Sequence, residues 1–561
     1  MSRSMGHVPT YVGTQSFYRN LDLQSLEQHA PARLPPRSDE TVESVKDIVL
    51  ELSLERETDE EIPNSDLTPF ARQYLTNRHG TVDIDPMPSA RDADPYNWPR
   101  SKKLSVLFLL AFHCMVSNLS MTALIPAYTQ LADEFGMTAH DCTYLTLIQV
   151  IILGVAPLTW GPLATIYGRR PVFLVSLMMS MVGNVACAVS PNYGSTMFFR
   201  AFVAFFLSPA NTLSSAVVTD MFLRTERARG ISICTLISSL GVPFGPLIFG
   251  FVTPRAGFRW IFWVLAITNG VQFILDFFLG HETLFIRSMN ESGGVSEERP
   301  KDLKSKYLKF ERIGSRRISK LDFLEPLAMA SYPRVILPAI AQSIVFLFGS
   351  IFLVVEIPLQ PGHKFHLNTD QISLQFLGMI IGCMIAEPAG GILSDMGMNL
   401  RRTTGGEDAS PPEFRLWLSY AGYCLILTGV PLFLVSTENA LTGQWTITPV
   451  VGTAIAAGGN QIGMTTLATY AVDCAVDDAV SVGILISFVR QLIAFIGPLW
   501  YLSLKLDYPD LISALLTLPF RFPTMIHSVG LSWSTSIAYS IVILLSLLPT
   551  ILLHVKGKHW R

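Results

Sequence analysis

About twelve apolar stretches of roughly 20 residues follow one another between residues 104 and 555. A helix of that length crosses the hydrocarbon core of a bilayer, and lipid admits only helices or closed barrels as spanning structures. The sequence therefore predicts an all-α membrane protein with twelve transmembrane helices. The predicted spans are 104–126, 139–163, 171–190, 196–219, 229–252, 259–280, 334–357, 371–394, 414–435, 447–472, 481–503 and 533–555.

The low charge content, the spacing of the cysteines and the absence of known motifs exclude several classes of protein. Charged residues make up 15% of the chain, whereas soluble proteins carry about 25%. The seven cysteines have no paired spacing, so neither a disulfide framework nor a metal site is expected. No Walker-type Gly-Lys-Ser/Thr motif and no nucleophile–base pair is visible. We therefore expect no cofactor, no metal, no nucleic-acid partner and no enzymatic activity.

The spans divide the chain into five segments. Residues 1–98 are polar and rich in Pro, Ser, Glu and Asp, which predicts a disordered cytosolic tail. Residues 99–280 form a first six-helix bundle, and residues 334–555 form a second. A basic central loop, 281–333, connects them, and 556–561 is a short C-terminal tail.

Lysine and arginine collect on alternate connections, which predicts the orientation in the membrane. With the N-terminus inside, the inner connections contain most of them, and both termini and the central loop are cytosolic. We expect the plasma membrane, with the vacuolar membrane as the alternative, a lipid-embedded chain and a functional monomer. The inner set is Arg169, Arg170, Arg224, Arg227, Arg229, Arg401, Arg402, Arg415, Lys556, Lys558 and Arg561.

The two halves of the chain repeat one another. In 217–247 and 470–499, an aspartate at a helix end, Asp220 or Asp473, precedes an apolar helix that contains a Gly-Pro pair. Parallel repeats of six helices indicate two pseudo-symmetric bundles that face each other across a central cavity. This repeat favours a transporter over a receptor or an enzyme.

A tight turn joins the second and third spans. Its sequence GPLATIYGRR contains Gly161 and Gly168, followed by Arg169 and Arg170. The pattern resembles the signature loop of the major facilitator superfamily, and the resemblance implies that these residues gate the inner side. The position that is usually acidic is Thr165 here.

Two aspartates are the candidate partners of this loop. Asp395 keeps the acid at the corresponding position of the second half, and Asp220 ends the fourth span on the same membrane face. A pair between Asp220 and Arg169 would hold the inner side closed. The alternative is that these charges only anchor helix ends.

Three of the ionisable residues inside predicted spans are candidates for a functional role, because a charge costs about 2.5–3.5 kcal/mol at the bilayer centre. Arg200 resembles the arginine of the superfamily's fourth-helix motif, which is associated with proton transfer; the alternative is a side chain that reaches the outer surface. Glu387 is the first candidate to exchange a proton and attract a cationic substrate, with a structural hydrogen bond as the alternative. Arg490 lies in mid-span, so it must face protein or water.

Small and polar residues complete the candidate site. The run Gly241, Gly245, Pro246 and Gly250 resembles the antiporter motif of exporters, although it also fits a generic packing kink. Polar side chains within the spans are candidates to line the cavity. They are Asn118, Thr122, Gln149, Asn211, Gln342, Asn460 and Gln461.

Further strings narrow the resemblance. DADPYNWPRSKK before the first span, PPEFRLW before the ninth and TYAVD…FVRQ near the end are similar to fungal twelve-span drug–proton antiporters. The resemblance implies proton-coupled efflux of a small lipophilic or cationic compound, such as a drug, toxin, secondary metabolite or polyamine. Proton-coupled uptake by the same fold is the alternative.

The orientation can be tested with accessible tags. We expect tags at residues 1 and 310 to be protected in sealed cells, because positive charge keeps these segments inside. A tag at residue 443, in a predicted outer loop, is the control that should be labelled. External labelling at residue 1 or 310 would contradict the topology.

Overall fold

The computed structural model describes residues 69–79, 87–89, 91–285, 320–388, 390, 412–475, 478–502 and 543–557. The chain separates into two units, residues 1–83 with Arg561 and residues 84–560. The described part of the first unit is the helix α4 (Pro69–His79). All other described helices belong to the second unit, and these ranges contain no β-strand, which confirms the all-α prediction. Asp395, most of the central loop and most of the N-terminal tail lie outside the described residues.

The first half of the second unit consists of long helices that coincide with the first six predicted spans. The second predicted span is a bent pair, α7 and α8, whose axes differ by 43°. The bend lies at the Pro157 start of α8, where proline lacks a backbone donor. The helices are α5 (Arg100–Thr122), α6 (Tyr128–Phe135), α7 (Ala139–Val155), α8 (Pro157–Tyr167), α9 (Arg169–Val189), α10 (Tyr193–Met221), α11 (Arg224–Ala256) and α12 (Arg259–Leu279).

The second half matches the remaining spans less completely. Its first span is interrupted by a π-helical segment, Leu347–Ile351, and its last span is described from residue 543 onward. Among the described residues, nine helices are long and apolar enough to cross a membrane, or ten with the bent pair. The helices are α15 (Pro333–Phe346), α16 (Phe352–Lys364), α17 (Thr369–Gln375) with helical residues 377–388, α19 (Leu416–Asn439), α20 (Thr448–Asp473), α21 (Ala479–Leu502) and α25 (Leu548–Lys556).

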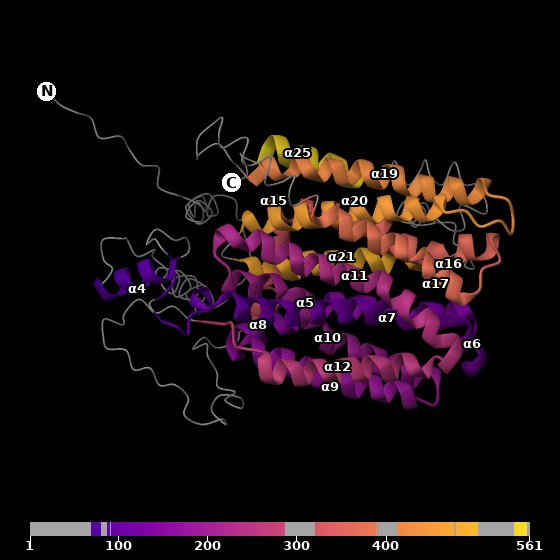
Figure 1. Ribbon diagram of the computed structural model, residues 1–561, viewed down its shortest axis with the longest axis horizontal. Helices are drawn as coiled ribbons and strands as arrows, with labels where there is room; N and C mark the ends of the chain where they lie inside the picture. The colour runs from indigo at the N-terminus through magenta and orange to yellow at the C-terminus, as the bar shows by residue number, and fades with distance from the viewer. Residues whose placement is uncertain are drawn as a thin grey trace, which may run out of the picture. The chain divides into compact units, whose positions relative to one another are not determined.

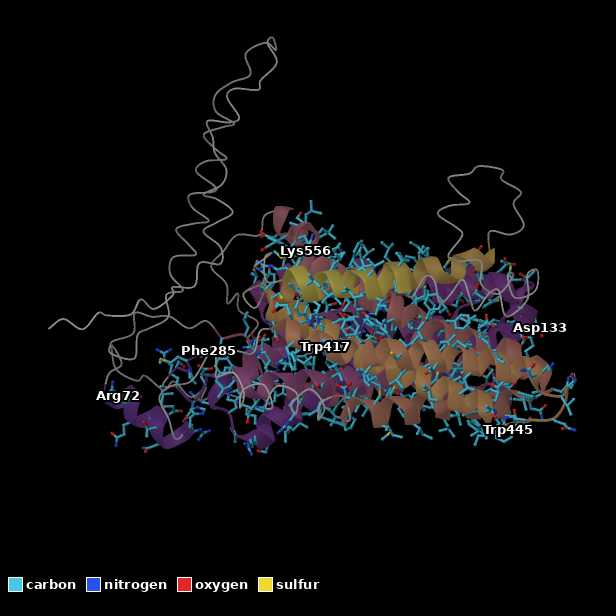
Figure 2. The ribbon with its side chains drawn as sticks, turned by 90° about the horizontal axis from the view of Figure 1, so that it is seen from above. Arg72, Asp133, Phe285, Trp417, Trp445 and Lys556 are labelled. Carbon is cyan, nitrogen blue, oxygen red and sulfur yellow. The ribbon has the colours of Figure 1, made fainter. Side chains whose placement is uncertain are left out.

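Within this unit the long helices run alongside one another, with the first half and the orange-to-yellow second half on opposite sides (Figure 1). Phe285 and Lys556 mark one end of the helices, and Asp133 and Trp445 mark the other (Figure 2). We call these the Phe285 end and the Asp133 end. One buried apolar cluster contains Met121 and Leu153 of the first half together with Phe346 and Leu353 of the second. The two halves therefore share a core.

Glycines allow the closest helix contacts. Gly422 and Gly429 of α19 face Gly459 and Gly452 of α20, so closely that an added Cβ would collide with the partner backbone. Small residues at an interface let helices approach within lipid, where apolar side chains alone provide no drive to associate. This contact explains how α20, which is not among the nine helices that are apolar enough by length and composition to cross a membrane, is held inside the bundle.

The glycine run of α11 faces two different helices. Gly241 and Gly245 pack against α5, where an added Cβ would meet Met115 and Thr122. Gly250 packs against Ser373 of α17, in the other half. The run therefore serves one contact within the first half and one contact between halves, and Pro246 is buried between them.

Gly245→Ala tests the contact between α5 and α11. Alanine favours a helix over glycine by about 1 kcal/mol, but the added methyl group meets the Thr122 hydroxyl and the Leu119 carbonyl. We expect the cost of overpacking to exceed the gain in helix preference and to destabilise the protein by about 1–3 kcal/mol. The measurement is a lower melting temperature in detergent. Gly194→Ala is the control, because only Asn192 lies near its Cβ position. A variant at 245 that melts at or above the parent would contradict the close contact.

Candidate functional site

The turn between α8 and α9 consists of one residue, Gly168. Its backbone has φ 92° and ψ 165°, a conformation that a side chain would strain. This single residue reverses the chain and places Arg169 and Arg170 at the first two positions of α9. Gly161 has a separate role, because it lies within α8 and packs against Ile484 of α21.

Arg169 forms the ion pair that the sequence predicts. Its Nε donates to Oδ2 of Asp220 over 2.9 Å, and the Arg169 side chain is 4% exposed. The pair ties the start of α9 to the end of α10. In the second half, Arg415 and Asp473 form the equivalent pair over 3.2 Å, between the start of α19 and the end of α20. The internal repeat therefore extends to this interaction.

Glu282 also bonds to the turn between α8 and α9, a contact that the sequence did not predict. Its two carboxylate oxygens accept hydrogen bonds from the backbone N–H groups of Arg169 and Arg170, over 2.9 and 3.0 Å. A negative charge there satisfies free donors and opposes the positive end of the helix dipole. The Arg170 guanidinium in turn donates to the Phe277 carbonyl of α12 over 2.8 Å. The only signal in the sequence was an acid that directly follows an apolar span.

The segment DPYNWP packs next to Asp220 and Glu282. Asp94 caps a short turn by accepting from the Tyr96 N–H group, and the Tyr96 hydroxyl donates to the carbonyl of Thr219 over 2.9 Å. The Trp98 ring contacts the His281 ring edge-on at 5.7 Å. Thr219 and His281 directly precede Asp220 and Glu282 in the sequence. The predicted tail boundary at residue 98 thus falls after a segment that packs on the helices.

The Asp133 end has its own contact between the halves. Arg255 of α11 forms an ion pair with Asp370 of α17, with the nearest atoms 2.7 Å apart. The neighbouring contact of Gly250 with Ser373 joins the same two helices. Sequence analysis placed Arg255 outside the inner set but gave it no partner, because pairing across halves leaves no local pattern.

Arg200 lies inside the first half and does not reach a surface. Its side chain is fully buried, and its guanidinium donates to the carbonyl of Ser120 over 3.1 Å and to that of Leu145 over 3.5 Å. The Ser120 hydroxyl accepts from the predicted cavity residue Gln149 over 2.9 Å. Arg200 and Gln149 therefore belong to one buried polar network.

Glu387 is buried where the halves meet. Its Oε2 accepts from the amide of Gln461 over 2.8 Å and from the hydroxyl of Thr465 over 2.9 Å, both on α20. The Ser232 hydroxyl of α11, in the first half, lies near the same carboxyl group, whose Oε1 has no hydrogen-bond partner in the described residues. The carboxyl group therefore bonds to its own half and lies near the first half.

The remaining predicted cavity residues form two groups. Asn118, Asn211 and Ser238 hydrogen-bond to one another across α5, α10 and α11, with distances of 2.9–3.1 Å. Thr122 instead donates to the Val242 carbonyl over 2.9 Å, which joins α5 to α11. Gln342 and Asn460 are buried, and their side-chain carbonyl oxygens lack a hydrogen-bond partner in the described part of the chain.

Arg490 lies near the middle of α21 and is partly buried. Its guanidinium carbon lies 5.3 Å from the centre of the Phe346 ring of α15. Cys114 of α5 lies within electrostatic range of it. Arg490 therefore contacts α15 of its own half, and its helix packs against α7 and α10 of the first half. Within the described ranges, no group of three or more metal-ligating side chains occurs.

Comparisons with known proteins agree with this architecture. Residues 110–498 match the sequence profile of the Major Facilitator Superfamily. The MFS transporter cpaT of Aspergillus oryzae is 28% identical over 486 residues, covering 84% of this chain and 90% of the relative. Citrate exporter 1 of Aspergillus niger is 27% identical over 357 residues, with coverage of 59% and 66%. The crystal structure of the human organic anion transporter MFSD10 (TETRAN) aligns with a TM-score of 0.52 at 17% identity, covering 81% of this chain and 100% of that one.

A double-mutant cycle tests the gate pair. We expect Arg169→Ala and Asp220→Ala each to impair transport without preventing membrane insertion, because either change leaves a partner charge exposed to a nonpolar surrounding. Their effects should be non-additive by about 0.5–3 kcal/mol, as for residues in direct contact. The measurement is the transport rate of the single and double variants at matched surface expression.

The matched control is an exposed ion pair at the end of α5. Arg100 and Glu226 lie 3.5 Å apart, and the Arg100 side chain is 90% exposed. Exposed pairs contribute little, so the same cycle there should be additive. Normal transport by both gate variants would reduce Arg169 and Asp220 to helix-end anchors.

Proposed function

The chain belongs to the major facilitator superfamily, and on that basis we propose that it is a secondary active transporter that exports a small molecule in exchange for protons. The observation that carries the proposal is the position of Glu387. This buried carboxyl group bonds to the second half and lies near the first, so gaining or losing a proton can change how the two halves pack on each other. Within the bilayer such an ionisable group is costly and is typical of a proton or substrate pathway.

The proposed cycle is alternating access by rocking of the two halves. At the Asp133 end the halves are joined by Arg255 and Asp370, a pair that is partly exposed. Such a pair contributes only about 0–1 kcal/mol, so it can break in each cycle. The pairs Arg169–Asp220 and Arg415–Asp473 lie within their own halves, so they keep each half rigid while the halves move.

Protonation of Glu387 would change what the carboxyl group can do. As a carboxylate it only accepts hydrogen bonds, which suits the donors on Gln461 and Thr465. Once protonated it becomes a donor as well, and the balance between its partners on α20 and Ser232 on α11 shifts. We propose that this change couples proton uptake to the movement of one half against the other.

Export is favoured by two observations. The glycine run of α11 resembles the antiporter motif of exporters, and one relative is named Citrate exporter 1. We propose a small lipophilic or cationic compound as cargo, with proton-coupled uptake as the second candidate. We further propose a monomer in the plasma or vacuolar membrane, with both termini and the Phe285 end facing the cytosol.

Glu387→Gln tests the coupling, because glutamine imitates the protonated acid permanently. We expect the variant to exchange substrate across vesicles at equal concentrations but not to build a substrate gradient from an imposed pH gradient. Dissipating the pH gradient should stop the parent in the same way. The measurement is pH-driven accumulation in inside-out vesicles.

Glu356→Gln is the comparison variant, because Glu356 is a second buried acid of the second half. Loss of pH-driven transport in this variant alone would move the proton site to Glu356. Transport by the parent that ignores the pH gradient would refute the antiport proposal.

A further inference from the structure

We propose that Arg490 is the docking point for the carboxylate group of the transported compound, so that the cargo is an organic acid with an apolar body. This inference rests on the proposed transport function and narrows its cargo to a lipophilic acid, in place of the cationic compound considered above. It begins from an unusual feature: a guanidinium in the middle of a membrane helix that, in the described residues, lies beside the Phe346 ring and within electrostatic range of the Cys114 thiol.

None of the described residues neutralises the charge of Arg490. Its Nε is buried without a hydrogen-bond partner, and no described carboxylate pairs with it. An arginine has five N–H donors and stays charged. Leaving such a group within the bilayer is costly unless an anion or water completes it. Because the side chain is only partly buried, its outer donors remain accessible.

The surroundings of Arg490 lie at one depth. Cys114 on α5, Phe346 between α15 and the π-helical segment, and Asn460 on α20 all lie near the middle of their spans. Gly349, three residues beyond Phe346, packs against the Asn460 side chain, so these elements are neighbours. Substrate sites of such two-bundle transporters lie near the midplane where the halves meet. Arg490 lies at that place on α21, a helix that packs against α7 and α10 of the first half.

The side chains around Arg490 favour a ligand that has a carboxylate group and an apolar body. A planar guanidinium matches a carboxylate through two parallel hydrogen bonds. The Phe346 ring supplies an apolar surface for the rest of the compound, and the carbonyl oxygens of Gln342 and Asn460 are free to accept from hydroxyl groups. Glu387, by contrast, already holds two donors of its own half, so it is less suited to hold a cationic cargo.

Ligand binding by the purified full chain tests the proposal. The probes are benzoate and cinnamate, with benzamide, cinnamamide and benzylamine as neutral and cationic counterparts. We expect at least one carboxylate to raise the melting temperature of the parent, and the amides and the amine to leave it unchanged. Arg490→Gln should weaken the apparent affinity for that carboxylate at least tenfold, and Arg490→Lys should weaken it less, because lysine keeps the charge but not the planar fork.

Arg100→Gln is the control variant, since this exposed arginine lies far from any described buried site; it should bind like the parent. Equal carboxylate affinity in Arg490→Gln, stabilisation by benzylamine alone, or a parent that none of the carboxylates stabilises would each overturn the proposal. If Arg490→Gln does not fold, the carboxylate affinity of Arg490→Lys is the test. An affinity equal to the parent's would contradict a two-bond contact between the guanidinium and the carboxylate.

Transport in vesicles separates this inference from the proposed function. A parent that moves benzylamine, but no carboxylate, in response to a pH gradient would preserve proton-coupled transport and reject the acid site. Carboxylate binding that depends on Arg490, without pH-driven transport, would preserve the site and reject the coupling.

Discussion

Helices inside a bilayer gain little by hiding apolar side chains from lipid, so close backbone contact has to hold them together. In this chain the contact is made by glycines: Gly241 and Gly245 against α5, and four glycines between α19 and α20. The polar contacts between these helices depend on them. The Asn118 amide of α5 can reach Ser238 of α11, and α20 can carry Asn460 and Gln461 inside the bundle, because the helix axes lie so close.

The charges of the bundle follow two patterns. At the Phe285 end, arginines pair with aspartates within each half, and Glu282 adds a carboxylate to the start of α9. In the interior, the described partners of these charged groups are neutral. Carbonyls accept from Arg200, an amide and a hydroxyl donate to Glu387, and an aromatic ring lies beside Arg490. The first pattern suits rigidity, since both partners are present. The second leaves capacity for a proton or a ligand.

Much of this architecture was predictable from local patterns. Apolar length located the spans, and the signature turn together with the end of the fourth span predicted the pair Arg169–Asp220. The repeat of Asp220 in Asp473 was visible, but its partner Arg415 was not predicted. Glu282, the pair Arg255–Asp370 and the packing of DPYNWP were not predictable. Their partners lie over a hundred residues away, and no periodicity reports such contacts. The bend between α7 and α8 was missed for a different reason: an apolar run reads the same whether its helix is straight or bent.

The π-helical segment Leu347–Ile351 contains one residue more than an α-helix would need for the same turns. Each residue of an α-helix advances the chain by about 100° around the axis. Converting this segment to α-helix would therefore rotate Phe346 and everything before it relative to α16, without any helix leaving its neighbours. The span that contains both Phe346 and Glu356 can therefore twist at this segment. Rotation of α15 about its own axis can then accompany the rocking of the two bundles.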